Sequence, residues 1–236
     1  MSQVAVVTGA GSGVGRAIAV QLAALGWKVA LIGRRLETLE GTIKSIEEGV
    51  DRMKAFPCDV GDSNAVAQMA KDVLAAFGTI DVLVNSAGTN LAKRVLADLT
   101  DEAFDEVVKI NLSGAFYCIR EFLPIMRAKK AGTIINIISD AGLRTNPVSG
   151  AAYVASKFGL TGLNDTINIE ERKNGIRATA IFPGDINTPL LDRRPVPPPP
   201  EARQKMLQPE DIAACALLAI TLPHRAIVEH LVVRPA

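Results

Sequence analysis

The stretch VTGAGSGVGRAIA, from Val7 to Ala19, decides the fold. A short apolar run ends in it, four glycines follow at positions 9, 11, 13 and 15, and an amphipathic segment begins. Glycine permits positive φ angles and close backbone approach, and free amides at a helix N-terminus attract phosphate. The spacing is neither G-x-G-x-x-G nor a Walker loop, since no Lys-Ser/Thr pair follows. We predict a strand–turn–helix unit that cradles a pyrophosphate; a tight turn without a ligand is the alternative.

The same alternation of apolar run and amphipathic segment continues along the chain. The apolar runs are Val4–Val7, Val29–Ile32, Met53–Phe56, Val82–Val84, Ile134–Ile138, Ala178–Phe182 and Leu231–Val233. Consecutive apolar residues, many of them β-branched, are typical of strands covered on both faces. Helices are expected over Gly15–Leu25, Leu36–Glu48, Ala65–Phe77, Thr100–Ala128 with Thr100 as its N-cap, Tyr153–Lys173 and Pro209–Leu222. This order predicts the α/β class, as a single doubly wound, Rossmann-type domain over residues 1–236: a mostly parallel seven-stranded sheet with helices on both faces.

The composition argues against several classes of partner and site. The 236 residues carry 26 basic and 25 acidic side chains, so no nucleic-acid or membrane partner is indicated. The three cysteines are far apart, which favours reduced core thiols, and no cluster has the spacing of metal ligands. The N-terminus lacks the features of a signal peptide, so a cytoplasmic location is expected. His224 and His230 are expected to be structural or exposed.

The end of the second predicted strand bears on the cofactor. An acid about twenty residues past the glycine turn would hold a ribose 2′-hydroxyl, whereas an arginine would accept a 2′-phosphate. Arg34 and Arg35 occupy this place, and the nearest acid, Glu37, lies inside the next helix pattern. Because a guanidinium matches phosphate oxygens, NADP(H) is favoured, with NAD(H) as the alternative.

A phenol and an ammonium are four residues apart in SGAAYVASKFG, from Ser149 to Gly159. On a helix, this spacing brings Tyr153 and Lys157 to one face. A nearby cation favours the phenolate and lowers the pKa of a tyrosine, whereas burial alone would raise it. The pair is therefore expected to let Tyr153 exchange a proton near neutral pH.

The chain resembles the short-chain dehydrogenase/reductase family, and the motifs run nearly from end to end. They are Thr8-Gly9-x-x-x-Gly13-x-Gly15, Cys58-Asp59-Val60, Asn85-Ser86-Ala87-Gly88, Asn111 in the long helix, Ser139 after the fifth strand, Tyr153-x-x-x-Lys157, and Pro183-Gly184 with Thr188. Two features depart from the pattern. The spacing from Ser139 to Tyr153 has one extra residue, and Asp140 stands where a neutral residue is usual.

The resemblance implies a carbonyl–alcohol oxidoreductase that takes a small-molecule substrate. It implies Asn111, Ser139, Tyr153 and Lys157 as catalytic residues, with Ser139 holding the substrate oxygen and Asn111 a water that feeds protons to Lys157. Cofactor contacts are expected from Gly9, Gly11, Ser12, Gly13, Val14, Gly15, Arg34, Arg35, Asp59, Val60, Asn85, Ala87, Gly88, Tyr153, Lys157, Pro183, Gly184, Ile186 and Thr188. A homo-oligomer, tetramer or dimer, is expected on the helices Thr100–Ala128 and Tyr153–Lys173.

Two other functions stay open from the sequence. A halohydrin dehalogenase-like relative would replace the lysine and lose the glycine turn, which this chain keeps. A sensor or scaffold that binds NADP(H) without turnover would not need Ser139, Tyr153 and Lys157 together.

Substrate specificity is expected from Leu91–Leu96, Leu143–Ala152 and a substrate loop over residues 185–208. Leu143, Pro147, Val148 and Leu190 favour a small or medium apolar alcohol or carbonyl. Arg144, Arg193 and Arg194 leave an acidic or acyl-carrier substrate open. The proline run in RRPVPPPP, Arg193–Pro200, predicts a stiff surface loop, with a polyproline ligand for another protein as the alternative.

Overall fold

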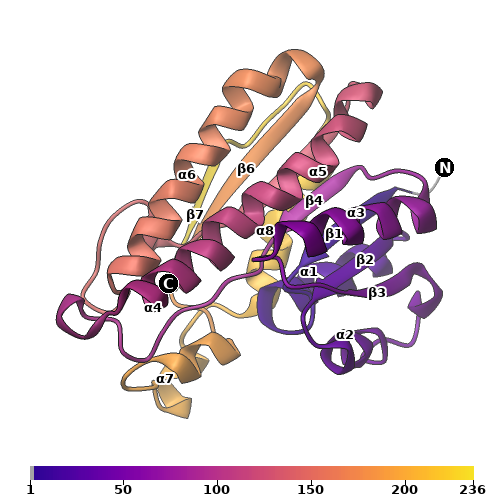
Figure 1. Ribbon diagram of the computed structural model, residues 1–236. Helices are drawn as coiled ribbons and strands as arrows, with labels where there is room; N and C mark the ends of the chain where they lie inside the picture. The colour runs from indigo at the N-terminus through magenta and orange to yellow at the C-terminus, as the bar shows by residue number, and fades with distance from the viewer. Residues whose placement is uncertain (1–2) are drawn as a thin grey trace.

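A computed structural model describes residues 3–236 as layers of helices around one sheet (Figure 1). The strands are β1 (Val4–Thr8), β2 (Lys28–Gly33), β3 (Met53–Pro57), β4 (Val82–Asn85), β5 (Gly132–Ile137), β6 (Ile176–Pro183) and β7 (His230–Val233). They form a seven-stranded sheet in the order β3-β2-β1-β4-β5-β6-β7. Every pairing is parallel, so the predicted fold class is confirmed and the sheet is more regular than expected.

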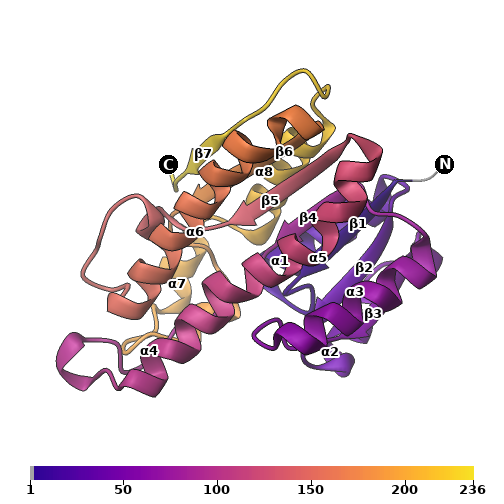
Figure 2. The ribbon, with the colours of Figure 1, turned by 45° about the horizontal axis from the view of Figure 1, so that its top comes forward.

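Helices cover both faces of the sheet, as Figures 1 and 2 show. The helices are α1 (Gly13–Ala24), α2 (Leu36–Ile43), α3 (Ser63–Phe77), α4 (Asp101–Val108), α5 (Gly114–Lys129), α6 (Ala151–Glu171), α7 (Pro200–Gln204) and α8 (Pro209–Thr221). On one face α1 and α8 pack together with Leu39 of α2, and on the other α3, α5 and the end of α6 form a second core. Strands β1, β4, β5 and β6 are buried along their length, whereas the two edge strands, β3 and β7, contain exposed residues.

The long helix expected over Thr100–Ala128 is interrupted. Thr100 caps it as predicted, because its hydroxyl accepts a hydrogen bond from the amide of Ala103 at 3.3 Å. A π-helical turn over Lys109–Ser113 then separates α4 from α5 and contains Asn111. Such turns insert one extra residue into the helical hydrogen-bond ladder and are frequent at functional sites.

Two predicted boundaries are wrong. The helix expected to reach Glu48 ends at Ile43, and the Ser45 hydroxyl donates to the Thr42 carbonyl at 2.7 Å just beyond that end. The proline run is not a loop throughout, since its last member, Pro200, is the first residue of the short helix α7. Proline suits the first position of a helix, because the amide of that residue has no carbonyl partner within the helix and proline lacks only this amide proton.

The cysteines and histidines singled out in the sequence also have defined surroundings. Cys58, Cys118 and Cys215 are free thiols, and burial raises the pKa of Cys58 to about 11. His224 is exposed, and His230 lies on β7 with its Nε2 2.6 Å from the carboxylate of Asp165. No helix within residues 3–236 combines the length and apolar character needed to cross a membrane.

Candidate active site

The glycine turn is held open by close backbone contacts. Ser86 and Ala87, which follow β4, both donate their amides to the Thr8 hydroxyl at 3.0 Å. A Cβ at Gly9 would lie 2.9 Å from the Ser86 carbonyl oxygen, and Gly9 has φ +68°. These contacts bring the ends of β1 and β4 together beneath the start of α1. A side chain at Gly9 would therefore collide with the backbone that follows β4, so the close packing of the turn against that segment requires glycine.

A cavity of about 250 Å³ opens above this turn at the carboxyl ends of the strands. Among the predicted site residues, its walls contain Gly9, Ser12, Gly13, Val14, Gly15, Gly88, Ser139, Tyr153, Lys157, Pro183, Gly184, Ile186 and Thr188. Ligands of doubly wound sheets bind in this place, outside the carboxyl ends of the strands. The structure thus brings the glycine turn and the Tyr153–Lys157 pair to one cavity.

The remaining predicted contacts lie elsewhere. Asn85 and Ala87 are behind the cavity wall, and Asn85 donates to the side chain of Asn136 at 2.9 Å inside the sheet. Gly11 faces α2, because a Cβ there would lie 2.4 Å from the Thr38 hydroxyl. These residues shape the turn rather than line the cavity.

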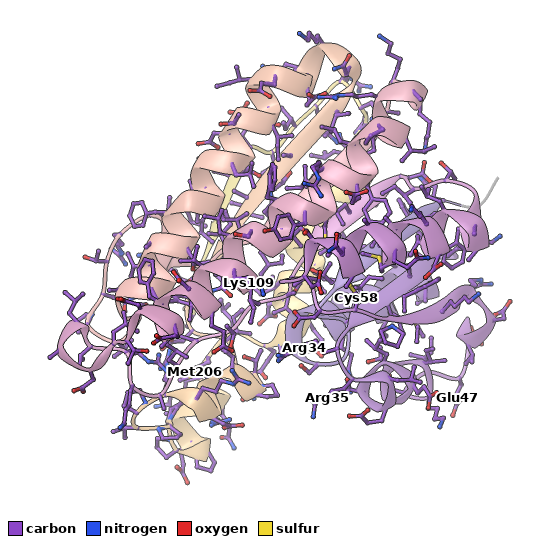
Figure 3. All side chains as sticks on the ribbon, in the orientation of Figure 1. Arg34, Arg35, Glu47, Cys58, Lys109 and Met206 are labelled. Carbon is purple, nitrogen blue, oxygen red and sulfur yellow. The ribbon has the colours of Figure 1, made fainter. Side chains whose placement is uncertain are left out.

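The residues predicted to contact the 2′-phosphate end of the cofactor lie beside α2. Arg34 and Arg35 are exposed at the end of β2, and Asp59 and Val60 follow β3. Arg35 is 3.9 Å from the carboxylate of Glu37. Figure 3 shows Arg34 between Lys109 and Arg35, on the side of the molecule where β3 ends. Arg35 therefore has an acidic neighbour, and the contact of either arginine with a phosphate stays a prediction.

Ser139 follows β5 in a rarely populated backbone conformation, with φ 151° and ψ 158°. Its hydroxyl accepts from the amide of Ala141 at 3.2 Å and donates to the carboxylate of Asp140 at 3.3 Å. Strained residues outside the common regions cluster at sites where a side chain must be aimed. The Ser139 side chain lowers the pKa of Tyr153 and Asp140 raises it, so both residues lie near the phenol.

Lys157 is 4% exposed, and its ammonium donates to the Ile137 carbonyl at 3.1 Å. Its nitrogen lies 5.5 Å from the centre of the Tyr153 ring. Burial lowers the pKa of Lys157 to about 8. The lysine is thus positioned beside the phenol as expected, but its charge is itself costly to keep in the protein.

The expected lowering of the tyrosine's pKa is wrong for this structure. The pKa of Tyr153 is raised, first by burial, against the opposing effect of the Ser139 side chain; Asp140 raises it further, while Arg194 and Arg94 lower it. Burial disfavours the phenolate, and the sequence does not reveal how deeply a helical tyrosine is buried. The tyrosine therefore rests as a protonated acid.

Asn111 connects the long helix to the site through its side chain. Its oxygen accepts from the Thr89 amide at 2.8 Å, and its nitrogen donates to the Thr89 carbonyl at 3.0 Å and to the Ser156 hydroxyl at 3.1 Å. Both N–H donors of the amide are therefore used by protein atoms. Asn111 fixes α6 next to Lys157, and its predicted role of holding a water stays a prediction.

A pH-dependent stability follows from the buried lysine. An unfolded lysine has a pKa near 10.5, so between about pH 8 and 10.5 the unfolded chain binds a proton that folded Lys157 does not. Stability should therefore rise as pH increases through this range. Lys157→Met removes the buried ammonium, so its stability relative to wild type should be greatest below pH 8 and should fall by about 3 kcal/mol by pH 10.5.

Urea unfolding at pH 7.5 and pH 10 measures this difference. Lys71→Met is the matched control, because Lys71 is an exposed lysine on α3 and no burial penalty is relieved there. Parallel pH curves for wild type and Lys157→Met would contradict a lowered lysine pKa.

Comparison with known proteins identifies the chain. A family model described as short chain dehydrogenase matches residues 3–196. The chain belongs to the short-chain dehydrogenase family. It is 35% identical over 233 residues to an uncharacterized oxidoreductase of Staphylococcus aureus (strain USA300), covering 99% of this chain and 97% of that protein.

Two solved structures of the family superpose over nearly the whole chain. An alcohol dehydrogenase from the archaeon Thermococcus sibiricus, complexed with 5-hydroxy-NADP, has a TM-score of 0.88 and 31% identity, with 100% of this chain and 97% of that chain covered. A 3-ketoacyl-(acyl-carrier-protein) reductase from Brucella melitensis, complexed with NADH, has a TM-score of 0.89 and 28% identity, with 98% and 96% covered. The resemblance seen in the sequence motifs is therefore confirmed, and the chain is an oxidoreductase of this family.

Asn90 lines the cavity and was not singled out from the sequence. Arg94, Asp140 and Arg194 also line it; the sequence had placed Arg94 within a specificity segment, Asp140 as a departure from the family pattern and Arg194 as a contact for an acidic substrate. The specificity segments predicted over Leu91–Leu96 and Leu143–Ala152 contribute only Arg94, Asn146, Val148 and Ser149. No sequence signal distinguishes Arg94 from an exposed arginine, because its burial depends on distant segments of the chain.

Proposed function

We propose that the chain is an NADP(H)-dependent oxidoreductase that interconverts a carbonyl and a secondary alcohol. The observation that carries the proposal is the convergence of Ser139, Tyr153 and Lys157 on the cavity above the glycine turn. Family membership supports the reaction class, and the alcohol dehydrogenase similar to this chain was solved with an NADP derivative. NAD stays the alternative cofactor, since the similar ketoacyl reductase was solved with NADH.

The residues at the turn fit a dinucleotide. A Cβ at Gly9 would meet the Ser86 carbonyl oxygen at 2.9 Å, and one at Gly13 would meet the Thr188 methyl at 3.2 Å. Both contacts are with protein atoms, so glycine lets the turn pack this closely, and the amides at the start of α1 would hold the pyrophosphate. Pro183, Gly184, Ile186 and Thr188 would close over the nicotinamide from β6 and the loop that follows.

The chemistry divides between the cofactor and three side chains. When bound, the nicotinamide supplies or takes up the hydride and, when oxidised, adds a positive charge near the phenol. Tyr153 gives its proton to the carbonyl oxygen during reduction and takes a proton from the alcohol during oxidation. Ser139 donates a hydrogen bond to the same oxygen and stabilises its negative charge. Lys157 holds Tyr153 and the ribose in position. The raised pKa of Tyr153 keeps the phenol protonated at neutral pH, which is the form that donates a proton in reduction.

The assay that tests the proposal follows reduced nicotinamide while NADPH or NADH is offered with a panel of small ketones and aldehydes. Oxidation of NADPH with at least one carbonyl substrate supports the proposal. Tight NADPH binding without turnover of any member would instead favour the sensor or scaffold alternative.

Cofactor preference should depend on Arg34. Arg34→Gln should raise the KM for NADPH by about 10- to 100-fold and leave the KM for NADH nearly unchanged, because one charged hydrogen bond to the 2′-phosphate is lost. Arg35→Gln is the matched control, since the Arg35 guanidinium lies 3.9 Å from Glu37, and its effect should be smaller. Wild-type enzyme that prefers NADH, or equal effects of the two variants, would contradict this assignment.

The predicted dimer or tetramer stays a prediction. Among the apolar residues of α6, Leu160 and Ile167 lie in the core, whereas Phe158 is 44% exposed. Phe116 on α5 is similarly exposed at 43%. Two exposed aromatic rings on the helices expected at an interface are compatible with the proposal.

A further inference from the structure

Arg94 is a buried cation in the wall of the active-site cavity. It lies between Gly88 and the short turn over Leu96–Asp98, and it is 7% exposed. Its Nη1 donates to the Val148 carbonyl at 3.0 Å and its Nη2 to the Arg193 carbonyl at 2.5 Å. Its Nε is buried and has no hydrogen-bond partner in the part of the chain that the structure describes. Two of the five N–H donors of this guanidinium are therefore used.

A second buried arginine shows what a purely structural guanidinium looks like in this protein. Arg177 is 6% exposed, so its burial matches that of Arg94. It uses all five donors, on the Thr133 hydroxyl and on the carbonyls of Ile220, Leu222, Pro223 and Ala226. Arg94 has the same burial with fewer than half of these hydrogen bonds, and no ion pair to it is found over residues 3–236.

The charges around Arg94 leave an excess of positive charge on one wall. Burial lowers the pKa of Arg94, and the neighbouring Arg194 lowers it further. Arg194 also lines the cavity and forms an ion pair with Asp185, so the one acid near it is already used. Both guanidinium groups are close enough to Tyr153 to lower its pKa. An anion bound here would therefore lie near the proton-transferring phenol.

The acids of the cavity determine where that anion can lie. Asp140 accepts from the Ser139 hydroxyl at 3.3 Å and raises the pKa of Tyr153, whereas Arg194 and Arg94 lower it. An anionic group on the Asp140 side would be repelled. A substrate whose hydroxyl meets Ser139 and Tyr153 must therefore direct its negative charge toward Arg94.

We propose that the substrate is a small hydroxy acid or oxo acid whose carboxylate is bound by Arg94, with Arg194 on the same wall. This inference rests on the proposed function. A guanidinium with free N–H donors matches the two oxygens of a carboxylate. The cavity of about 250 Å³ must also hold the nicotinamide, so the acid is short. Val148, Leu190 and Leu191 provide the apolar part of the wall, so the apolar substrate expected from the sequence is revised to an acid with a short apolar chain.

The reaction balances with the cofactor already proposed. In the oxidative direction Tyr153 first releases its proton to solvent and becomes a phenolate. The carbinol C–H bond then breaks, its hydride would pass to bound NADP⁺, and the hydroxyl proton passes to the phenolate. The products are the oxo acid, NADPH and one proton released to solvent. The carboxylate is unchanged, and its role is to orient the carbinol carbon and to compensate the charge of Arg94.

The test compares 3-hydroxybutyrate with its methyl ester, and 2-hydroxybutyrate with its methyl ester, as substrates with NADP⁺. Wild type should prefer the acid of at least one pair in kcat/KM. Arg94→Gln should lower the acid-to-ester ratio by about 30- to 100-fold, because a charge-assisted bidentate contact is lost. Arg144→Gln removes an equal charge from an exposed arginine outside the cavity and should leave the ratio unchanged. A wild-type preference for both esters, or an unchanged ratio in Arg94→Gln, would overturn the inference.

Two further measurements keep the test decisive. Arg194→Gln changes a partly exposed residue and should lower the same ratio several-fold, which covers the case in which Arg94→Gln does not fold. Calorimetry of 3-hydroxybutyrate and 2-hydroxybutyrate binding to the protein saturated with NADP⁺ needs no turnover. Arg94-dependent binding of an acid without turnover would defeat the proposed function but support the carboxylate site. Turnover of neutral alcohols without preference for acids would defeat the site and leave the function intact.

Discussion

Replacement of Tyr153 by Phe should lower kcat by about 10²- to 10⁴-fold, the usual contribution of a general acid or base. Phe keeps the ring that packs beside Lys157 and removes only the hydroxyl that carries the proton. The NADPH dissociation constant should change less than about threefold, since most of the proposed cofactor contacts lie in the glycine turn and the β6 loop.

Steady-state kinetics and fluorescence titration with NADPH measure the two quantities separately. Tyr117→Phe is the matched control, because Tyr117 is the second of the two tyrosines and lies on α5 outside the cavity. Its loss of a hydroxyl should leave kcat unchanged. Full activity in Tyr153→Phe would remove the proposed mechanism, and it would favour a protein in which the Tyr153–Lys157 pair only binds the cofactor.

The fold could be read from the sequence because its strands are buried on both faces. All eight residues of β6 and all five of β1 are buried, and the runs Val4–Val7 and Ala178–Phe182 are apolar at every position except Thr179. Helix boundaries were less predictable. The end of α2 depends on a local side-chain hydrogen bond from Ser45, and the π-helical turn at Asn111 is fixed by contacts with Thr89 and Ser156, which are distant in sequence.

The active site was predictable to the extent that its chemistry is local. Tyr153 and Lys157 are one helical turn apart, so their spacing alone places them together. Arg94 is different, because the carbonyls that hold it belong to Val148 and Arg193, 54 and 99 residues farther along the chain. The expected direction of the Tyr153 pKa shift was wrong for the same reason. Segments that are distant in sequence bury the phenol, and the local pattern does not show that they meet there.

The substitution Gly15→Ala should lower both the stability of the protein and its affinity for NADPH. A Cβ at this position would lie 2.4 Å from the Gly9 carbonyl oxygen, 2.7 Å from its carbon and 3.0 Å from the Thr8 carbonyl oxygen. All three are backbone atoms of the turn, so they cannot give way as the end of a flexible side chain can. Overpacking of this kind costs about 1–3 kcal/mol. The turn must move to relieve it, and the amides that cradle the pyrophosphate move with it.

Helix propensity alone predicts the opposite sign, which makes the comparison informative. Alanine is favoured over glycine inside a helix by about 1 kcal/mol. Gly162→Ala measures the propensity effect alone. Gly162 is an exposed residue within α6, and its added Cβ would meet nothing within 4 Å. Thermal unfolding should therefore show Gly162→Ala slightly stabilised and Gly15→Ala destabilised, with NADPH binding weakened at least tenfold only in the latter. If Gly15→Ala instead gained stability and bound NADPH normally, α1 would not need its close contact with the turn, and the pyrophosphate cradle would have to be located elsewhere.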